Sequence, residues 1–375
     1  MADEEPIRRR RTRASVSANS GRPRQRRNAL TVKQRLGQFY TNNYVYILEG
    51  FRVPDNVSTI IEPFAGNGDL IEFFGYDRYF VYCYDIEPKK GFIIQQDTIL
   101  NPPNYTNKYV ITNPPYLARN KCEDKTLFDK YDVNDLYKCF LKELCINCCQ
   151  GGIIIIPVNF WCSIRAGDIA LRKLFLEKYV VEKIKIFEEQ VFSDTTYTVC
   201  VVQFSQRIND LSNEISIMVS PGNILMSVDL NENNNYMIGG LIYKLPESTT
   251  YKISRLTSKN KTNPSTNIMV KCIDDNENSK IGLSFVEDDA KIVDETPNQS
   301  NRTYCTLTIE PQISIEMQKQ LIRKFNSYFE RKRRQYHSLF LSNYRESKDI
   351  ARKRVSFDLI YLIVGYILDN FDRIN

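Results

Sequence analysis

Residues 59–68 read TIIEPFAGNG, a short apolar run that leads directly into a glycine turn (the glycine turn, residues 62–68). Glycine adopts positive φ at little cost and lets the backbone approach a ligand closely, so such a turn is typical of a ligand site. It does not have the pattern of a phosphate-binding P-loop, because GxxxxGK[ST] and its lysine are absent. The stretch therefore predicts a buried strand followed by a ligand-contacting turn.

Short apolar runs and helix-compatible stretches alternate after this turn. The predicted strands are Thr59–Ile61, Tyr79–Tyr84, Lys108–Thr112, Gly152–Pro157, Val180–Phe187 and Tyr197–Phe204, and the predicted helices are Leu70–Gly75, Leu136–Cys149 and Ile169–Lys178. Such alternation is typical of an α/β fold, a mostly parallel Rossmann-like sheet with helices on both faces. Ligands of such sheets bind at the carboxyl ends of strands, so the residues that follow each strand are the site candidates.

An acidic residue follows the second predicted strand, in the stretch YDIE at residues 84–87. An acid about twenty positions after a glycine turn can accept hydrogen bonds from ribose hydroxyls, which suits NAD and S-adenosylmethionine alike. Continued to Lys89, the stretch also has the acid-x-Lys spacing of metal-dependent nucleases, but the position of Asp85 after the glycine turn favours ribose. Asp97 is a candidate contact to an adenine amine.

The third predicted strand runs into NPPY at residues 113–116 (the NPPY turn). Proline fixes φ and lacks a backbone donor, so consecutive prolines hold the carbonyls of Asn113 and Pro114 outward in a rigid turn. The Asn113 side-chain oxygen and the Pro114 carbonyl can then accept from one exocyclic amine, which directs the nitrogen lone pair toward an electrophilic methyl group. Tyr116 offers a flat face for a base. An ordinary Pro-Pro turn is the alternative, and the upstream glycine turn argues against it.

The positive charge of the chain is unevenly distributed. The 375 residues carry a net charge of +6, and residues 1–28 hold nine arginines against three acids. Because apolar residues are few there, we interpret 1–28 as a disordered arm. Three uses of this arm are open: DNA tracking through counterion release, a localisation signal, or a solubilising tail.

Ten cysteines occur in a chain whose N-terminus is charged rather than apolar, so they predict no secretory disulfides. The longest apolar stretch, Ile153–Val158, is too short to span a membrane. Cys145, Cys148 and Cys149 resemble a metal cluster, but paired ligands at zinc spacing are missing and the only histidine is His337. We expect core cysteines, no metal, and a reduced, soluble, intracellular protein.

The character of the chain changes after about Arg207, and residues 208–345 are polar and irregular. A basic helix is expected over Gln318–Tyr336, where basic and aromatic residues interleave. This pattern suits either a nucleic-acid surface or a solvated helix with an apolar inner face. Val355–Phe371 predicts a buried terminal helix. The expected organisation is an arm at 1–28, an α/β domain at 29–207 and a second domain at 208–375.

Residues 33–205 resemble the gamma class of amino-methyltransferases of restriction–modification systems, including members found in large DNA viruses of algae. The block RLGQFYT at 35–41 resembles the family's N-terminal block, whose threonine contacts the methionine part of S-adenosylmethionine; this implies that role for Thr41. The family's glycine turn corresponds to Glu62–Gly68, its ribose acid to Asp85 and its adenine contact to Asp97.

Later blocks follow in the family's order. DLYKCF at 135–140 resembles the helix that lines the cofactor site, and GGIIIIP at 151–157 with Phe160 resembles the next strand. VFSD at 191–194 and TVCVVQF at 198–204 resemble the late block whose aromatic residue clamps the flipped base, which implies Phe192 as partner of Tyr116. The catalytic residues implied are Asn113, Pro114, Pro115, Tyr116 and Phe192. The cofactor contacts implied are Gln38, Tyr40, Thr41, Glu62, Phe64, Ala65, Gly66, Gly68, Asp85, Ile86, Asp97, Thr98 and Asn113.

The resemblance implies a site-specific DNA methyltransferase of a type II system. Such an enzyme transfers a methyl group from S-adenosylmethionine to the N6 amine of an adenine rotated out of double-stranded DNA. The family layout implies a mixed α+β target-recognition domain at 208–375 and a separate restriction endonuclease as functional partner. It implies a location in the cytoplasm, or in the nucleus for a virus of a eukaryotic host.

Other activities fit parts of the pattern. The NPPY turn can also orient a protein glutamine, an RNA base or the N4 amine of cytosine; asparagine at 113 favours adenine over cytosine, and relatives that act on glutamine carry a helical domain before the glycine turn. A pseudoenzyme or DNA-binding subunit would be expected to have lost one turn, and both are intact. A bifunctional restriction enzyme would need a nuclease motif, and only the spacing near Asp85 resembles one.

Overall fold

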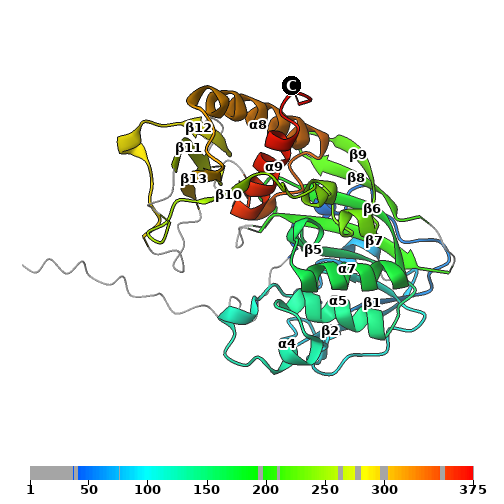
Figure 1. The fold of residues 1–375 in the computed structure, drawn as a ribbon. Helices are drawn as coiled ribbons and strands as arrows, with labels where there is room; N and C mark the ends of the chain where they lie inside the picture. Colours follow the sequence, from blue (N-terminus) through cyan, green and yellow to red (C-terminus); the bar gives the residue numbers. More distant parts are fainter. Residues whose placement is uncertain are drawn as a thin grey trace, which may run out of the picture.

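The structure is a computed structural model that describes residues 37, 41–75, 77–192, 197–208, 212–260, 265–274, 280–295, 303–346 and 351–374. The predicted arm at 1–28 lies outside these residues. A large sheet with its helices occupies the right of Figure 1, from β9 at the upper right to β2 below, and a smaller sheet lies at the upper left, with helices α8 and α9 between the two.

The large sheet has the strand order β3-β2-β1-β4-β5-β7-β6-β8-β9. The strands from β3 to β5 in this order are parallel, and β7 runs antiparallel between β5 and β6. Each predicted strand is present, and the predicted α/β fold class is confirmed. The strands are β1 (Thr59–Glu62), β2 (Phe80–Asp85), β3 (Ile94–Gln95), β4 (Tyr109–Thr112), β5 (Gly151–Pro157), β6 (Tyr179–Phe187), β7 (Val199–Gln206), β8 (Glu214–Ser220) and β9 (Ile224–Asp229).

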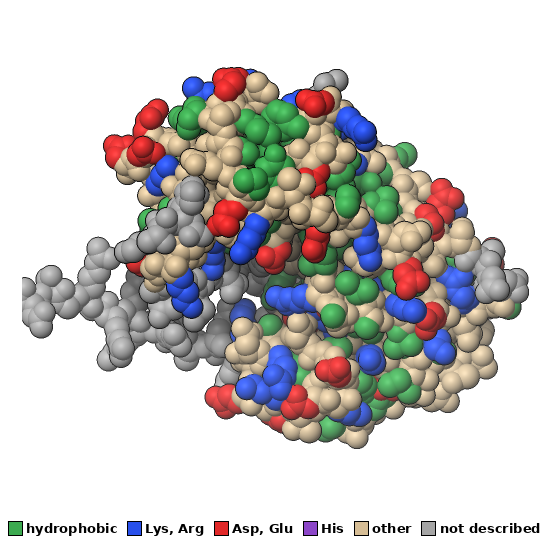
Figure 2. Space-filling view, in the orientation of Figure 1, with side chains coloured by type: hydrophobic (Ala, Val, Ile, Leu, Met, Phe, Trp, Pro, Cys, Tyr) green, Lys and Arg blue, Asp and Glu red, His purple; other side chains and the backbone are tan. Residues whose placement is uncertain are grey.

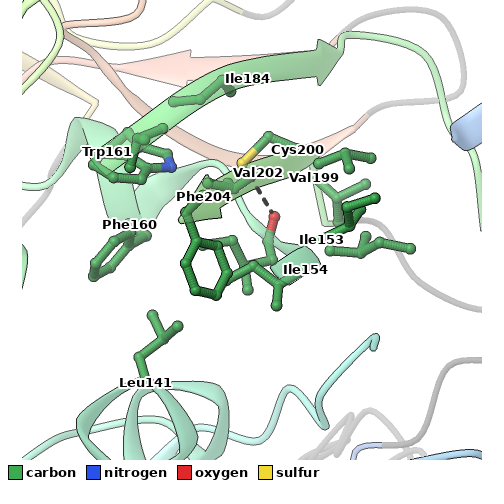
Figure 3. Close-up of a cluster of buried hydrophobic side chains, with 14 of the residues drawn as sticks. Leu141, Ile153, Ile154, Phe160, Trp161, Ile184, Val199, Cys200, Val202 and Phe204 are labelled. Atoms are coloured by element: carbon green, nitrogen blue, oxygen red, sulfur yellow. Dashed lines mark hydrogen bonds between the residues drawn. The ribbon is translucent and has the colours of Figure 1, made fainter. Parts of the chain in front are cut away.

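The centre of the sheet is buried on both faces. Every residue of β5 is buried, which is why its sequence is a continuous apolar run rather than an alternating one. Figure 3 shows β5 and β7 side chains packed together, with Leu141 of a neighbouring helix pointing toward them and Trp161 at one side. The Cys200 thiol donates a hydrogen bond to the Ile156 carbonyl at 3.5 Å, which satisfies a polar group inside this core.

Helices α5 and α7 lie side by side along the large sheet (Figure 1). A buried ion pair joins them, with 2.5 Å between Lys138 Nζ and Asp168 Oδ1. Cys145 and Cys149 are buried in the core, as predicted, whereas Cys148 is half-buried, and the helix ends at Ile146, before Cys148 and Cys149. The helical segments here are α2 (Tyr44–Ile47), α3 (Ile71–Phe74), α4 (Thr126–Tyr131), α5 (Leu136–Ile146), α6 (Asn159–Cys162), α7 (Ala166–Lys178) and the 3-10 helix η1 (Arg119–Lys121).

The large sheet extends past residue 207, where the sequence analysis placed a domain boundary. β8 pairs with β6 in parallel and β9 pairs with β8, so the sheet ends at Asp229. β8 buries Ile215, Ile217 and Val219 and leaves Glu214 and Ser216 exposed. A strand near a sheet edge is polar on one face, so the polar composition of this segment concealed its place in the sheet.

The C-terminal part contains a smaller antiparallel sheet of order β10-β13-β11-β12, on which α8 and α9 pack. The predicted basic helix and terminal helix are both present. No helix among the described residues is long and apolar enough to cross a membrane. The elements are η2 (Glu232–Asn234), η3 (Gly240–Lys244), β10 (Lys252–Arg255), β11 (Ser265–Lys271), β12 (Gly282–Phe285), η4 (Asp288–Ala290), β13 (Tyr304–Glu310), α8 (Ile315–Gln335), β14 (Ser342–Glu346), β15 (Ala351–Arg354) and α9 (Phe357–Asp369).

Helix α8 has the apolar inner face that was one of the two interpretations of its sequence. Leu321, Phe325, Tyr328 and Phe329 are buried at helical spacing in the second core. Arg333 also points inward, where its Nη1 and Nη2 donate to Asp274 at 3.0 and 2.7 Å. The pair is largely buried, so Arg333 links α8 to Asp274 inside the smaller part of the protein.

A polar junction ties this smaller part to the large sheet. Glu188 directly follows β6, and its carboxylate accepts from Lys353 Nζ at 2.6 Å and lies 2.9 Å from His337 Nε2. Burial alone would raise the pKa of Glu188, but the His337 hydrogen bond and the Lys353 charge outweigh it and lower that pKa to about 2. Two further hydrogen bonds connect α6 and α7 to the segment between η2 and η3: Arg172 donates to the Asn235 carbonyl, and the Ile238 amide donates to the Trp161 carbonyl.

Candidate active site

The glycine turn and the NPPY turn lie at the same edge of the sheet. β1 pairs in parallel with β2 on one side and with β4 on the other. Along the chain, β2 and β3 are added on one side of β1, and β4 and β5 are then added on its other side, so the strand order switches between β1 and β4. Ligands of open α/β sheets bind at such a switch point, outside the carboxyl ends of the strands. The sequence therefore placed both turns where this fold binds ligands.

The glycine turn brings bare backbone to this edge. Gly66 and Gly68 have φ of 53° and 75°, conformations that favour glycine. The Gly66 amide donates to Asp85 Oδ2 at 2.8 Å, and the Ala65 amide donates to the Tyr84 carbonyl at 2.8 Å. These bonds hold the turn against the end of β2, which places Asp85 directly beside it.

Acidic groups surround the glycine turn. Glu62 is buried, and its Oε2 has no hydrogen-bond partner among the described residues. Burial raises the pKa of Glu62 well above its ordinary value, and the nearby charges of Asp69 and Asp85 raise it further. An unsatisfied buried carboxyl beside like charges favours a positively charged ligand. S-adenosylmethionine has an ammonium and a sulfonium, so the residues present fit this cofactor.

Apolar and polar groups extend the site beyond Asp85. Ile86 is 39% exposed and Phe92 48% exposed, although both are large apolar residues. A Cβ added at Gly68 would lie 3.4 Å from the Phe92 ring, which places Phe92 against the glycine turn. Phe92 was not found by sequence reasoning, because it belongs to no motif. These side chains offer an apolar surface suited to a nucleobase ring.

Asp97 lies in a loop that is tied to the glycine turn. Its Oδ1 accepts from the amides of Ile99 and Leu100 at 3.1 and 3.0 Å, and the Thr98 hydroxyl donates to the Pro63 carbonyl at 2.8 Å. The loop therefore lies beside the predicted cofactor site. The contact of Asp97 with an adenine amine stays a prediction.

The NPPY turn is held by side chains from distant segments. Asn113 Nδ2 donates to Thr41 Oγ1 at 3.1 Å, and both residues are buried. The Tyr116 hydroxyl donates to Asn113 Oδ1 and contacts the Ile155 carbonyl at 2.8 Å. The Tyr116 amide donates to the Gly37 carbonyl at 2.9 Å. The structure thus joins Thr41 and Asn113, which are 72 positions apart in sequence.

The aromatic residues predicted to clamp a base are both buried here. Tyr116 and Phe192 are each 3% exposed. The rings of Tyr137 and Tyr197 lie edge-on to Tyr116, with centroids at 6.0 and 5.8 Å. The flat face of Tyr116 that the sequence analysis assigned to base stacking is covered in this structure, so a base can stack on it only after a rearrangement.

Two predicted positions lack a described structure, and three others are partly or fully covered by protein. Gln38 and Tyr40 lie outside the described residues. Pro114 is buried, Pro115 is half-buried, and Phe64 packs edge-on against Phe140 at 5.1 Å.

Asp135 supports the chain that leaves the NPPY turn and was given no role of its own from the sequence. Its Oδ1 accepts from the Leu117 amide at 3.1 Å. Burial raises the pKa of Asp135 to about 7, opposed by the charge of Lys138 and by backbone hydrogen bonds. A cleft of about 400 Å³ opens beside this segment, and none of the cofactor candidates lines it. Its lining is Arg119, Phe128, Asp129, Asp132, Val133, Asn134, Arg165, Gly167 and Asp168.

Comparison with known proteins gives a family match for part of the chain. Residues 89–192 match the model of the Eco57I restriction-modification methylase family. This range includes the NPPY turn, α5, β5 and Phe192, and it excludes the glycine turn. No curated protein sequence matches the chain.

Solved structures of restriction–modification proteins show a distant likeness. The methyltransferase subunit of a type I system from Streptococcus thermophilus has 16% identity, with 49% of this chain and 47% of that chain covered and a TM-score of 0.37. The type IIG restriction endonuclease BpuSI has 15% identity, coverage of 61% and 35%, and a TM-score of 0.38. The DrdV–DNA complex has 14% identity, coverage of 63% and 36%, and a TM-score of 0.39. The chain spans about half the length of the first protein and about a third of the other two.

Proposed function

We propose that this protein is an S-adenosylmethionine-dependent DNA methyltransferase that modifies the N6 amine of adenine. One observation carries the proposal: the buried Asn113 carboxamide follows β4, beside the glycine turn of β1, with its nitrogen bonded to Thr41. The family match over residues 89–192 supports it, because that range includes the whole NPPY turn. Assignment to the gamma class, to a type II system or to an algal virus stays a prediction.

The cofactor pocket in this proposal is formed by the glycine turn and the end of β2. S-adenosylmethionine, when bound, supplies an electrophilic methyl group on a sulfonium centre. Glu62 and Asp69 favour the positive charges of the ligand, Asp85 accepts from the ribose hydroxyls, and Ile86 and Phe92 cover the adenine ring. The backbone at Gly66 and Gly68 permits close approach.

The NPPY turn orients the target amine. Asn113 Oδ1 and the Pro114 carbonyl accept from the two N–H groups, so the nitrogen lone pair is drawn out of conjugation with the ring and points toward the methyl group. The nitrogen forms a bond to the methyl carbon as the bond from that carbon to the sulfonium sulfur breaks, and the amine releases one proton to water. Acceleration then comes from positioning and fixed dipoles rather than from a general base.

DNA must deliver the adenine out of its stack, at a cost of a few kcal/mol. In the proposed bound state the base lies between Tyr116 and Phe192, both of which must first be uncovered. Figure 2 shows a hollow between the two parts of the protein, with Lys and Arg as well as Asp and Glu side chains along its edges. We assign this hollow to the duplex and the C-terminal part to sequence recognition, with a separate endonuclease as functional partner.

The direct test is Asn113→Ala, assayed with radiolabelled S-adenosylmethionine and duplex DNA. We expect methyl transfer to fall about 100-fold or more, by analogy with the loss of one fixed catalytic dipole, while cofactor binding changes little. The exposed Asn56→Ala is the matched control and should keep full activity. Full activity of Asn113→Ala, or transfer to RNA or protein instead of DNA, would contradict the proposal.

A further inference from the structure

Gly37 and Thr41, which precede α2, each contact one end of the NPPY turn. The Gly37 carbonyl accepts from the Tyr116 amide at 2.9 Å, and Thr41 Oγ1 accepts from Asn113 Nδ2 at 3.1 Å. Thr41 is 4% exposed and Asn113 8% exposed, so water competes little for this second bond. The family resemblance assigns Thr41 to the cofactor, and the structure places its hydroxyl against the Asn113 carboxamide.

A carboxamide has two different ends, and only one suits an amine substrate. Its oxygen accepts hydrogen bonds, and its nitrogen carries two donors. If the Asn113 carboxamide rotated by half a turn, its NH₂ group would face the N–H groups of the target amine, and no hydrogen bond could form. The orientation of this side chain therefore decides whether the turn can bind an amine.

We propose that Thr41 is a positioning residue that stabilises the orientation that an amine requires. A hydroxyl can donate as well as accept, so the contact with Thr41 is compatible with either orientation before substrate binds. When the target amine donates to Oδ1, Nδ2 faces Thr41, and the Thr41 hydroxyl oxygen accepts from it. This inference rests on the proposed function and adds a role that is separate from cofactor binding.

Tyr116 allows Oδ1 to change partner without loss of a buried hydrogen bond. Its hydroxyl has a single hydrogen, and two acceptors, Asn113 Oδ1 and the Ile155 carbonyl, lie within reach of it. When a target amine takes Oδ1, the hydroxyl keeps the bond to Ile155. No buried hydroxyl is left unsatisfied, and the Thr41 bond at the other end of the carboxamide is unaffected.

The segment that carries Thr41 is itself anchored to the sheet. α2 begins three residues later, and the Tyr46 carbonyl accepts from Lys185 Nζ of β6 at 3.1 Å. The Tyr46 ring lies 5.7 Å from that of Phe187, and its hydroxyl contacts Glu189 and Ser220. These contacts restrict movement of Thr41, as a positioning residue requires.

The test compares Thr41→Val, which keeps the shape but removes the acceptor, with Thr41→Ser, which keeps the acceptor. At saturating S-adenosylmethionine, we expect Thr41→Val to lower kcat about tenfold, the effect of one buried hydrogen bond, and Thr41→Ser to stay within about threefold of wild type. Thr266→Val is the matched control, since Thr266 is also buried and donates to a carbonyl, but in the smaller sheet.

A second background tests orientation itself. Asn113→Asp has oxygens at both ends of the side chain, so rotation no longer matters; Thr41→Val should change kcat less than about twofold there. Equal losses in both backgrounds would overturn the inference. An unchanged kcat with a raised KM for S-adenosylmethionine in the single variant Thr41→Val would also overturn the inference, because Thr41 would then act only on the cofactor. This comparison needs only the single variant, so it holds even where Asn113→Asp is too slow to measure. Absence of N6-methyladenine with the wild-type protein would instead overturn the proposed function.

Discussion

Removing the carboxylate of Glu188 should weaken the junction between the large sheet and the C-terminal part, and the loss should depend on pH. Glu188 lies between His337 and Lys353, at 2.9 and 2.6 Å. These partners stabilise its charged form, so Glu188→Gln removes an attraction to Lys353, whose side chain is only 11% exposed. Since the Gln amide can replace one hydrogen bond but not the charge, we expect a stability loss.

The size and sign follow from the pKa. Glu188 titrates near 4.5 when unfolded, and its pKa is lowered to about 2 in the folded protein. This difference corresponds to about 3 kcal/mol at neutral pH, and about 2–3 kcal/mol after screening of a side chain that is 30% exposed. Because the folded pKa is the lower one, the stabilisation is complete above pH 4.5 and is lost as pH falls toward 2. With this screening, linkage gives a loss of about 1–1.5 kcal/mol between pH 5 and pH 3.

Urea unfolding, followed by fluorescence, measures this difference. Trp161 is the only tryptophan, is fully buried and accepts from the Ile238 amide at the junction, so it reports on the relevant region. The stability gap between wild type and Glu188→Gln should shrink by about 1–1.5 kcal/mol from pH 5 to pH 3. Glu182→Gln, an exposed change on β6, the strand that Glu188 follows, is the control and should show no gap. A gap independent of pH, or none at pH 5, would refute the reasoning.

Three further changes test the site and its support. Glu62→Gln should weaken S-adenosylmethionine binding about tenfold. Burial raises the pKa of Glu62 and a cationic ligand favours its ionised form, so binding to the wild type should release protons and should tighten as pH rises. Calorimetry in two buffers measures both the affinity and the proton release. Gly37→Ala should reduce methylation, because its new Cβ would lie 2.8 Å from the backbone of the NPPY turn, and its φ of 68° alone should cost about 1–2 kcal/mol of stability. A Cβ added at Gly91 meets no atom within 4 Å, so Gly91→Ala should change neither methylation nor stability. Asp168→Asn should lower stability by about 3 kcal/mol in thermal unfolding, because it leaves the Lys138 charge buried without its ion-pair partner; an unchanged midpoint would contradict this.

The elements of the large sheet were predictable where burial left a continuous apolar run. The stretch GGIIIIP of β5 lies at the centre of the sheet with both faces covered, so its sequence alone indicates a strand. β8 and β9 were not predicted. The exposed positions of β8 carry the polar residues Glu214 and Ser216, and β9 is largely exposed, so neither strand is a continuous apolar run. Their place depends on pairing with β6, which sequence periodicity does not report.

The site was predictable as a set of strand ends but not as a set of contacts. Asp85 and Asn113 follow strands that parallel pairing brings to one edge. The bond from Asn113 to Thr41 and the contact of Glu188 with His337 join positions 72 and 149 residues apart, and they depend on how the loops fold. The burial of Tyr116 likewise follows from its hydroxyl partners rather than from the motif.

Nucleoside mass spectrometry of duplex DNA incubated with the protein and S-adenosylmethionine tests the central claim most directly. We predict that the wild type forms N6-methyladenine and that Asn113→Ala forms none. Sequencing of the modified DNA with detection of methylated bases should place the N6-methyladenine within one short recurring sequence. N4-methylcytosine, or unmodified DNA together with methylated RNA or protein, would contradict the account.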